Sequence, residues 1–314
     1  MWLWTATNFF PSRHRCCGQC CQRKITIKKT TGETEQVTEY YHRGVVAHLI
    51  GFDIPVVLDI EMILPGEGEI VAARRLLERL LVRYARFFDA IQGDALYLEG
   101  PLFNLCLKHH KHILAVLKDN NPALLADAKG LMRGEPGLIH QEDKRLVRYW
   151  DEEGFTTDSI QTPFRVLRAE ETETKRERIA DEWVEKVQTS TWFWATTIPQ
   201  SLIPSRQLRY VGHDRWKIEN RIFNALGEHW GLDHCFRHDP VAIPNFILIL
   251  FIAHTLVQCF YRLNMKQPLR GRFSLIAVAR QILLGIATWG THPAAWLLPR
   301  RAAWLFPHNN PPPS

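Results

Sequence analysis

The chain has 314 residues, 46% apolar and 23% charged, and this composition excludes disorder as the dominant state because it supplies the side chains of a core. Residues 1–50 carry seven Lys/Arg and three acids, residues 240–314 carry seven and none, and residues 51–239 carry 25 and 30. The two ends of the chain therefore have net charges of +4 and +7, and the middle has a net charge of −5. This division excludes a uniformly basic surface and suits a protein that contacts a polyanion through its ends and binds cations in its middle.

The seven cysteines and the first residues indicate a reducing compartment. An odd number of cysteines argues against a secreted domain held by disulfides. The start Met1-Trp2-Leu3-Trp4 lacks the basic region and the long apolar stretch of a signal peptide. We therefore expect a cytoplasmic location.

The first part of the chain alternates between β-rich runs and helical periodicity, which is typical of an α/β layer structure. The clearest helix covers residues 67–87, where apolar side chains recur three and four residues apart and so share one face. The other expected elements are strands at 45–50, 56–60, 88–93 and 112–117, and helices at 101–109 and 121–132.

The pattern changes near residue 134, where glycine and proline interrupt it. Residues 134–204 are interpreted as a β-rich insertion with one charged helix at 175–188, and the first part, 1–133, as the start of a core. Residues 205–297 are expected to be a helical part that completes this core, with helices at 213–230, 243–263 and 273–289. The remaining residues, 298–314, lack periodicity and are expected to form a flexible tail.

Two carboxylates stand at positions that suit chemistry. Asp94 directly follows an apolar strand, where α/β sheets place ligands, although an aspartate there can equally cap a helix. Glu219 follows Arg215 by four residues in a predicted helix, so both share one face, and a solvated ion pair is the usual meaning of that spacing.

Four short motifs, taken in order and spacing, resemble one family, the DDE transposases of bacterial insertion sequences. The resemblance runs from about Asn8 to about Arg270. Its motifs are Pro65-Gly66-Glu67-Gly68-Glu69, Gly93-Asp94-Ala95-Leu96-Tyr97, Lys118-Asp119-Asn120 and Arg215-Trp216-Lys217-Ile218-Glu219-Asn220.

The resemblance implies a ribonuclease-H-like mixed sheet with flanking helices, in which two Asp and one Glu hold two Mg²⁺ or Mn²⁺ ions for attack on DNA phosphodiesters. Asp94 matches the second Asp and Glu219 the Glu. Arg215 matches the arginine of the family's Tyr-x2-Arg-x3-Glu-x6-Lys signature, whereas its Tyr and Lys positions hold Gly212 and Leu226. The implied partners are the terminal inverted repeats of the element and a second copy of the chain, in the bacterial cytoplasm on DNA.

The first Asp of the family pattern is missing. The matching positions are Thr5-Ala6-Thr7-Asn8. One set of codons for the first eight residues, read in another frame, encodes Val-Ala-Val-Asp-Gly-Asn-Glu, which suggests that a frameshift near Phe9 and Phe10 replaced the first strand and its Asp. Asp59, at the end of another predicted strand, is the alternative third metal ligand. With two carboxylates alone, two metal ions would be poorly held, so we expect impaired catalysis.

Other residues allow a second interpretation beside an ordinary structural one. The cluster Cys16-Cys17-Gly18-Gln19-Cys20-Cys21 has the spacing of half a zinc site, but no second Cys pair follows, and a reduced loop is favoured. The Trp192-Phe193-Trp194 run could stack on an unpaired base, although a packed strand accounts for it more simply. The histidines at 229, 234 and 238 are interpreted as structural support or DNA contacts.

Two alternative functions remain beside an active transposase. One is a DNA-binding transposase remnant without catalysis. The other is a membrane protein, because residues 243–263 are nearly long and apolar enough to span a bilayer. Polar residues interrupt that segment, so we favour buried helices behind Glu219 and no membrane.

Overall fold

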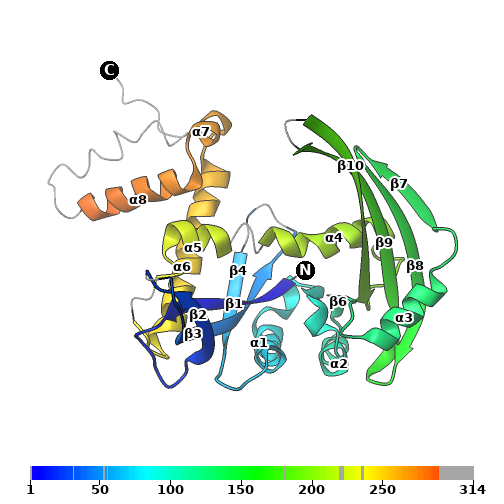
Figure 1. Cartoon of the computed structure of the whole chain (residues 1–314), viewed down its shortest axis with the longest axis horizontal. Coiled ribbons are helices and arrows are strands. Elements are labelled where there is room, and N and C mark those ends of the chain that lie inside the picture. Colours follow the sequence, from blue (N-terminus) through cyan, green and yellow to red (C-terminus); the bar gives the residue numbers. More distant parts are fainter. Residues whose placement is uncertain are drawn as a thin grey trace.

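The computed structural model describes residues 2–30, 32–51, 54, 56–179, 182–218, 223–234 and 237–289. Within them, strands form one mixed sheet in the order β2-β3-β1-β5-β6-β10-β9-β8-β7, with β4 paired to β3. Helices α1 and α2 lie on one side of the central strands and α4 on the other (Figure 1). The predicted α/β architecture, a mixed sheet with flanking helices like that of ribonuclease H, is confirmed.

The central strands combine antiparallel and parallel pairing. β1 is antiparallel to β3 and parallel to β5, and β5 is parallel to β6. On its other edge β3 pairs with both β2 and β4. The bounds are β1 Trp2–Ser12, β2 Cys21–Lys28, β3 Thr34–Leu49, β4 Val56–Ile63, β5 Ala90–Gly93 and β6 His112–Val116.

The first strand is present, which corrects the expectation that the chain lacks it. β1 runs beside β3 from Trp2 to Ser12 and occupies the centre of the sheet. Its residues are mainly aromatic or β-branched and fit a pleated surface. Phe9 and Phe10 are fully buried in a core cluster with β3, β4 and α6. A change of residues in this segment can therefore remove a carboxylate without removing the strand.

Three helices cover one face of the central strands. α1 (Glu69–Tyr84) buries Ala72, Ala73, Leu76, Leu77, Leu80 and Leu81, which is the periodicity expected from the sequence. α2 (Gly100–Lys108) and α3 (Pro122–Leu131) both begin near a proline, which suits the first turn of a helix because its missing N–H would have no partner there. Their apolar faces join α1 and the sheet in one large core.

The region after α3 is a long antiparallel sheet that curves away from the core (Figure 1). It consists of β7 (Leu138–Glu142), β8 (Arg145–Thr157), β9 (Ile160–Ile179) and β10 (Glu182–Thr196). The helix predicted at 175–188 is wrong, because residues 175–179 belong to β9 and residues 182–188 to β10. Their charges pair across strands rather than along a helix, as Arg176 does with Glu185 at 3.0 Å.

The helical part begins earlier than predicted. α4 (Ser205–Ile218) starts eight residues before the expected helix at 213–230, and α5 (Asn224–Trp230) covers the end of that range. α6 (Ala242–Cys259) continues into a π turn at Phe260–Asn264. α7 (Gln267–Arg272), which was not predicted, precedes α8 (Leu275–Trp289). The expected tail at 298–314 lies outside the described residues.

Both C-terminal apolar helices were expected to be buried, and α6 is buried on one side only. α6 packs Ile243, Ile247 and Phe251 against β1, β3 and β4, but Ile249 and Leu256 are 65% and 64% exposed on its other side. The segment Ala242–Asn264 is the one described helix long and apolar enough to cross a membrane, and a core helix of a soluble protein can have the same length and composition.

Candidate active site

Asp94 lies at the carboxyl end of β5, where the chain turns into a short 3-10 helix, Ala95–Tyr97. Its carboxylate accepts a hydrogen bond from the Leu96 N–H at 2.8 Å, so the capping role considered for this residue is real. The side chain is half-buried and stays in reach of solvent. A carboxylate at this place can cap the turn and still offer an oxygen to a cation.

The motif around Asp94 meets the motif that begins at Pro65. The Tyr97 hydroxyl donates to Glu69 at 2.8 Å, and Arg43 of β3 lies 2.6 Å from the other oxygen of Glu69. Gly93 is required here, because a Cβ atom at that position would lie 2.6 Å from the Tyr97 side chain. The glycine and the tyrosine of this motif therefore form one packing unit.

Burial sets the ionisation of this buried pair. Desolvation raises the pKa of Glu69, the Tyr97 hydroxyl and Arg43 oppose that rise, and the charge of Asp94 adds to it. Burial also raises the pKa of Tyr97, so that Tyr97 stays protonated and donates. Glu69 is only 8% exposed and is committed to two partners, which makes it a support for the Asp94 turn rather than an open cation ligand.

The third motif closes the same turn from the other side. Asn120 donates to the Ala95 carbonyl at 2.6 Å, and the adjacent Asn121 donates to the Leu98 carbonyl at 3.1 Å. Three motifs separated by some 25 residues each thus converge on the residues that follow Asp94. The three motifs therefore form one structural unit around Asp94.

The strand beside β5 runs toward this turn. β1 pairs with β5 in parallel, with Trp2 opposite Ile91 and Leu3 opposite Gln92. Continuing that register by two residues brings Thr5 level with Asp94. The position on β1 that lies level with Asp94 therefore carries no carboxylate.

Helix α4 crosses the sheet close to Asp94. The Gln92 side chain, two residues before Asp94, donates to the Gly212 carbonyl of α4 at 2.9 Å. A Cβ atom at Gly212 would lie 2.5 Å from the indole nitrogen of Trp194, so no tyrosine fits this position of the family signature. Arg215 belongs to the last turn of α4, and Glu219 lies outside the described residues.

Comparison with known families gives a match over most of the chain. The profile of the transposase DDE domain covers residues 24–256. The chain belongs to the DDE transposase family. Transposases of this family act on DNA and use divalent metal ions. Comparison with curated protein sequences gives no match.

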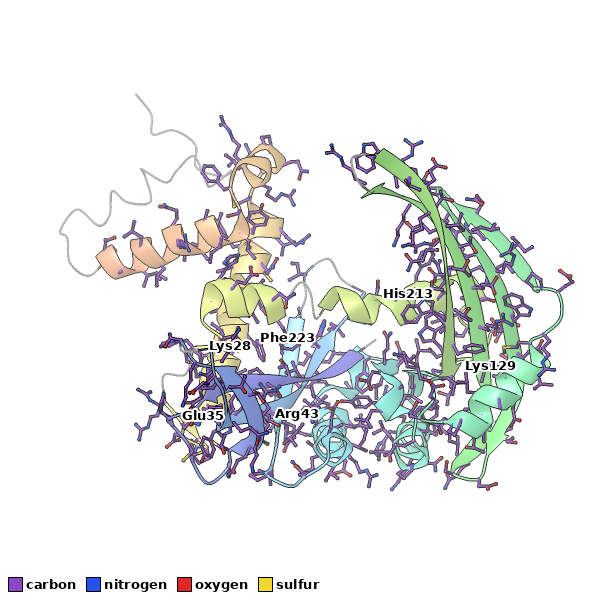
Figure 2. All side chains as sticks on the ribbon, viewed as in Figure 1. Lys28, Glu35, Arg43, Lys129, His213 and Phe223 are labelled. Atoms are coloured by element: carbon purple, nitrogen blue, oxygen red, sulfur yellow. The ribbon has the colours of Figure 1, made fainter. Side chains whose placement is uncertain are left out.

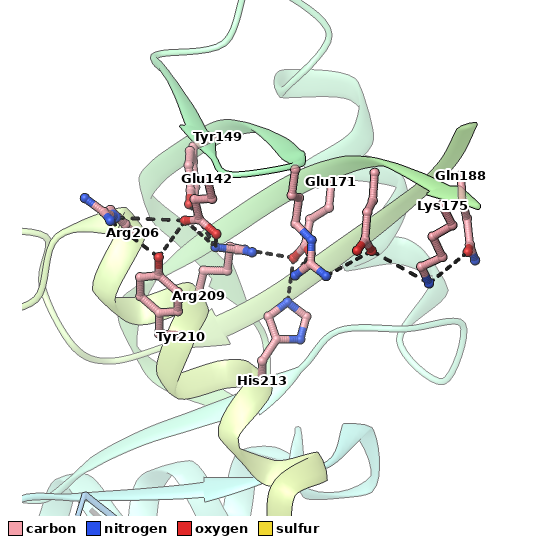
Figure 3. A network of polar contacts seen from close by, with 11 residues as sticks. Glu142, Tyr149, Glu171, Lys175, Gln188, Arg206, Arg209, Tyr210 and His213 are labelled. Atoms are coloured by element: carbon pink, nitrogen blue, oxygen red, sulfur yellow. Dashed lines mark hydrogen bonds and ion pairs between the residues drawn. The ribbon is translucent and has the colours of Figure 1, made fainter. Parts of the chain in front are cut away.

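In this transposase a buried charge network fixes α4 against the curved sheet (Figure 3). Arg209 is 1% exposed and donates to Glu171 of β9 at 2.8 Å and to Glu142 of β7 at 2.9 Å. One turn later, His213 lies 2.6 Å from the same Glu171 oxygen. Figure 2 shows His213 between α4 and the long strands.

The network holds Glu171 ionised. Burial would raise the pKa of Glu171, but hydrogen bonds from His213 and Arg209 overcome that effect and lower it to about 2. The pairing of Arg209 and His213 with Glu171 was not predicted, because the helix was expected to begin at residue 213, which left Arg209 outside it. Their four-residue spacing on one helix face was the available signal.

Asp59 lies apart from Asp94. It is on β4, separated from β5 by β3 and β1, or about 14 Å across three strand spacings. Its carboxylate pairs with Arg79 of α1 at 2.7 Å, on the α1 face of the sheet. The structure therefore does not bring Asp59 and Asp94 together.

The Trp192-Phe193-Trp194 run is packed into β10. Phe193 and Trp194 are 7% and 1% exposed, and the Trp194 ring contacts His213 edge-on at 5.2 Å between ring centroids. Packing in the strand accounts for this run, as the simpler interpretation held.

Proposed function

We propose that this chain is an insertion-sequence transposase that binds the ends of its element and whose metal-dependent strand cleavage and strand transfer are impaired. The observation that supports the proposal most is the parallel pairing of β1 with β5, in which Leu3 lies opposite Gln92, because the same register extended by two residues would bring Thr5 level with Asp94. In the family two aspartates and one glutamate share two metal ions, and here one of the two aspartate positions has no carboxylate.

Asp94 and Glu219 are the proposed metal ligands. Asp94 supports this role because it is half-buried, sits at a strand end and is oriented by the Leu96 N–H. Glu219 follows the last residue of α4, which is anchored beside Asp94 through Gln92 and Gly212. When bound, Mg²⁺ or Mn²⁺ would activate the attacking oxygen and stabilise the leaving oxygen of a phosphodiester.

The described donor set fits two metal ions poorly. Hard cations need several oxygen ligands, and Asp94 is the half-buried carboxylate that the turn itself supplies. Glu69 is engaged by Arg43 and Tyr97, and Asp59 by Arg79 on the other side of the sheet. We therefore leave Asp59 out of the proposed site and attribute the impairment to position 5.

The frameshift hypothesis agrees with this position. The Asp of the alternative frame would be encoded by bases that overlap the codons of Trp4 and Thr5. Extension of the strand register by two residues beyond Leu3 and Gln92 points to Thr5 without reference to any codon. The nucleotide sequence upstream of Met1 tests the hypothesis, and the absence of an open Asp-Gly frame there would contradict it.

DNA binding is the part of the function that we propose to be retained. The basic ends of the chain, +4 and +7, suit phosphate contacts. Arg215, in the last turn of α4, is proposed to contact a phosphate near Glu219. The proposed partners are the terminal inverted repeats and a second copy of the chain, in the bacterial cytoplasm.

We propose the same division of the chain as the sequence predicts, with an insertion at 134–204 between two parts of the core.

A non-catalytic DNA-binding remnant is the second candidate, and the threonine at position 5 favours it. The two candidates differ in the amount of Mg²⁺-dependent cleavage. A gel assay with a duplex that carries the inverted repeat flanking the gene measures both binding and nicking. Asp94→Ala and Glu219→Ala test the proposed ligands, and Glu228→Ala, an exposed residue of α5, is the control.

We expect wild type to bind this duplex and to nick it only slowly, with the residual nicking lost in both ligand variants and kept in the control. Binding without any nicking would identify the remnant. Rapid Mg²⁺-dependent strand transfer by wild type would contradict the proposed impairment, and equal affinity for an unrelated duplex would contradict recognition of the element ends.

A further inference from the structure

Two cysteines and two histidines from three parts of the chain meet beside the bend of β1. Cys17 and Cys20 lie between β1 and β2, His42 lies on β3, and His238 lies between α5 and α6. The ligand atoms of Cys17, Cys20 and His42 all lie within 4.8 Å of one another. The His238 Nδ1 atom is 3.0 Å from the Cys20 sulfur.

The distances among Cys17, Cys20 and His42 match the edges of a tetrahedron around zinc. With Zn–S of about 2.3 Å and Zn–N of about 2.0 Å, two sulfurs lie about 3.8 Å apart and a sulfur and a nitrogen about 3.5 Å apart. The two sulfurs here are 3.7 Å apart. The His42 Nε2 atom lies 3.4 Å from each sulfur. His238 is not one of the three residues whose ligand atoms are mutually within 4.8 Å, and its Nδ1 atom lies closer to the Cys20 sulfur than such an edge, so its ring would have to shift to take the fourth position.

The surrounding backbone orients these ligands. The Cys17-x-x-Cys20 turn is closed by a Cys20 N–H to Cys17 carbonyl bond of 3.1 Å, and the Cys17 N–H lies 3.2 Å from the Cys20 sulfur. The His238 Nε2 atom lies 3.1 Å from the Phe10 carbonyl and must donate to it. Neutral His238 therefore presents an unprotonated Nδ1 to Cys20, as a histidine ligand requires.

Burial disfavours charge on the individual ligands. It raises the pKa of the Cys20 thiol to about 11 and lowers the pKa of His42 to about 4. Neutral imidazoles are the form that binds metal. A divalent cation that displaced two thiol protons would leave the buried cluster with no net charge, which suits a site of low polarity.

We propose that Cys17, Cys20, His42 and His238 bind one structural Zn²⁺ ion. All four positions are filled by protein, so the ion has no open position for catalysis. Its role is to fasten the segment between α5 and α6 to β1 and β3. The sequence favoured a reduced loop at Cys16–Cys21 because no second Cys pair follows. In the proposed site the two histidines supply the ligands that a second Cys pair would have given. The proposal is independent of DNA cleavage.

Cobalt substitution of the full chain tests the site. Protein prepared with chelator and reductant is titrated with Co²⁺, whose tetrahedral complexes with thiolates absorb strongly in the visible range and show sulfur-to-metal charge transfer. We expect saturation at about one Co²⁺ per chain and displacement of the cobalt by Zn²⁺. Removal of Zn²⁺ from wild type should also lower its thermal unfolding midpoint.

Variants assign the ligands. Cys17→Ser and Cys20→Ser should abolish the charge-transfer band, while Cys16→Ser, the adjacent exposed cysteine, should leave it unchanged. His238→Gln should weaken the visible bands and keep the charge transfer, since a water would replace one nitrogen. Circular dichroism checks that each variant folds, and wild type alone decides the case if a variant does not. Failure of folded wild type to bind Co²⁺, an unchanged spectrum in Cys17→Ser, or loss of the spectrum in Cys16→Ser would overturn the proposal.

Discussion

The anchoring of α4 by Arg209 makes a prediction whose size follows from the structure. Arg209→Met keeps most of the aliphatic stem and removes the guanidinium that donates to Glu171 and Glu142. It also removes the contact of 3.3 Å to the Tyr149 hydroxyl. Since Arg209 is 1% exposed and the Glu171 side chain 6%, water cannot replace the lost donor without rearrangement.

Removing one partner of a buried ion pair costs about 3–5 kcal/mol, because the remaining charge is left unpaired. His213 and Arg145 still contact Glu171, at 2.6 and 3.2 Å, so we expect the lower end of that range. A loss of about 3 kcal/mol raises the unfolded-to-folded ratio about 150-fold. The effect should be largest on the packing of α4 against β9.

Urea unfolding, followed by tryptophan fluorescence and circular dichroism, measures this loss. Glu171→Gln is paired with Arg209→Met in a double-mutant cycle, and we expect the double variant to lose less than the sum of the single losses by at least about 1 kcal/mol. Arg206→Met, one turn earlier and exposed, is the matched control and should leave the midpoint nearly unchanged. A loss below about 1 kcal/mol in Arg209→Met, or strict additivity, would refute the reasoning.

Three further predictions concern stability. Gly93→Ala should destabilise the fold by about 1–3 kcal/mol, because its Cβ would displace the Tyr97 ring; an unchanged thermal midpoint would contradict the packing described. Glu171 has a folded pKa of about 2, below its unfolded value, so its contribution to the stability of the fold should be present above about pH 4.5 and disappear as the pH falls toward 2. Glu171→Gln should therefore flatten the dependence of the unfolding free energy on pH in this range. Asp59→Asn should lower the free energy of unfolding by about 1–3 kcal/mol, and this loss should shrink in an Arg79→Met background; an equal loss in both backgrounds would contradict the pairing of Asp59 with Arg79.

Sequence periodicity predicted those elements whose stability comes from local patterns. The helix at 67–87 was predicted because its apolar face repeats every three or four residues, and α1 confirms it. The charged residues of β9 and β10 suggested a helix because their charges alternate along the chain, whereas their partners lie across the strand pair. Cross-strand pairing depends on register, which a single sequence does not display.

The candidate site shows the same limit. Asp94 could be predicted because a strand end is visible in the sequence. The hydrogen bond from Tyr97 to Glu69 joins residues 28 positions apart, and the contact of Cys20 with His238 joins residues 218 positions apart. Such contacts exist only after the chain folds. The family resemblance indicated which motifs belong together, and the structure shows that three of them are in contact.

The rate of Mg²⁺-dependent nicking by Thr5→Asp tests the central claim most directly. The assay uses the same inverted-repeat duplex and compares this variant with wild type and with Thr7→Asp, a carboxylate about 6.6 Å further along β1. If position 5 is the vacant aspartate position, Thr5→Asp should nick at least about tenfold faster than wild type, which is equivalent to about 1.4 kcal/mol or more of transition-state stabilisation. Thr7→Asp should show no gain. Addition of Asp94→Ala to Thr5→Asp should abolish nicking. A folded, DNA-binding Thr5→Asp that nicks no faster than wild type would contradict it.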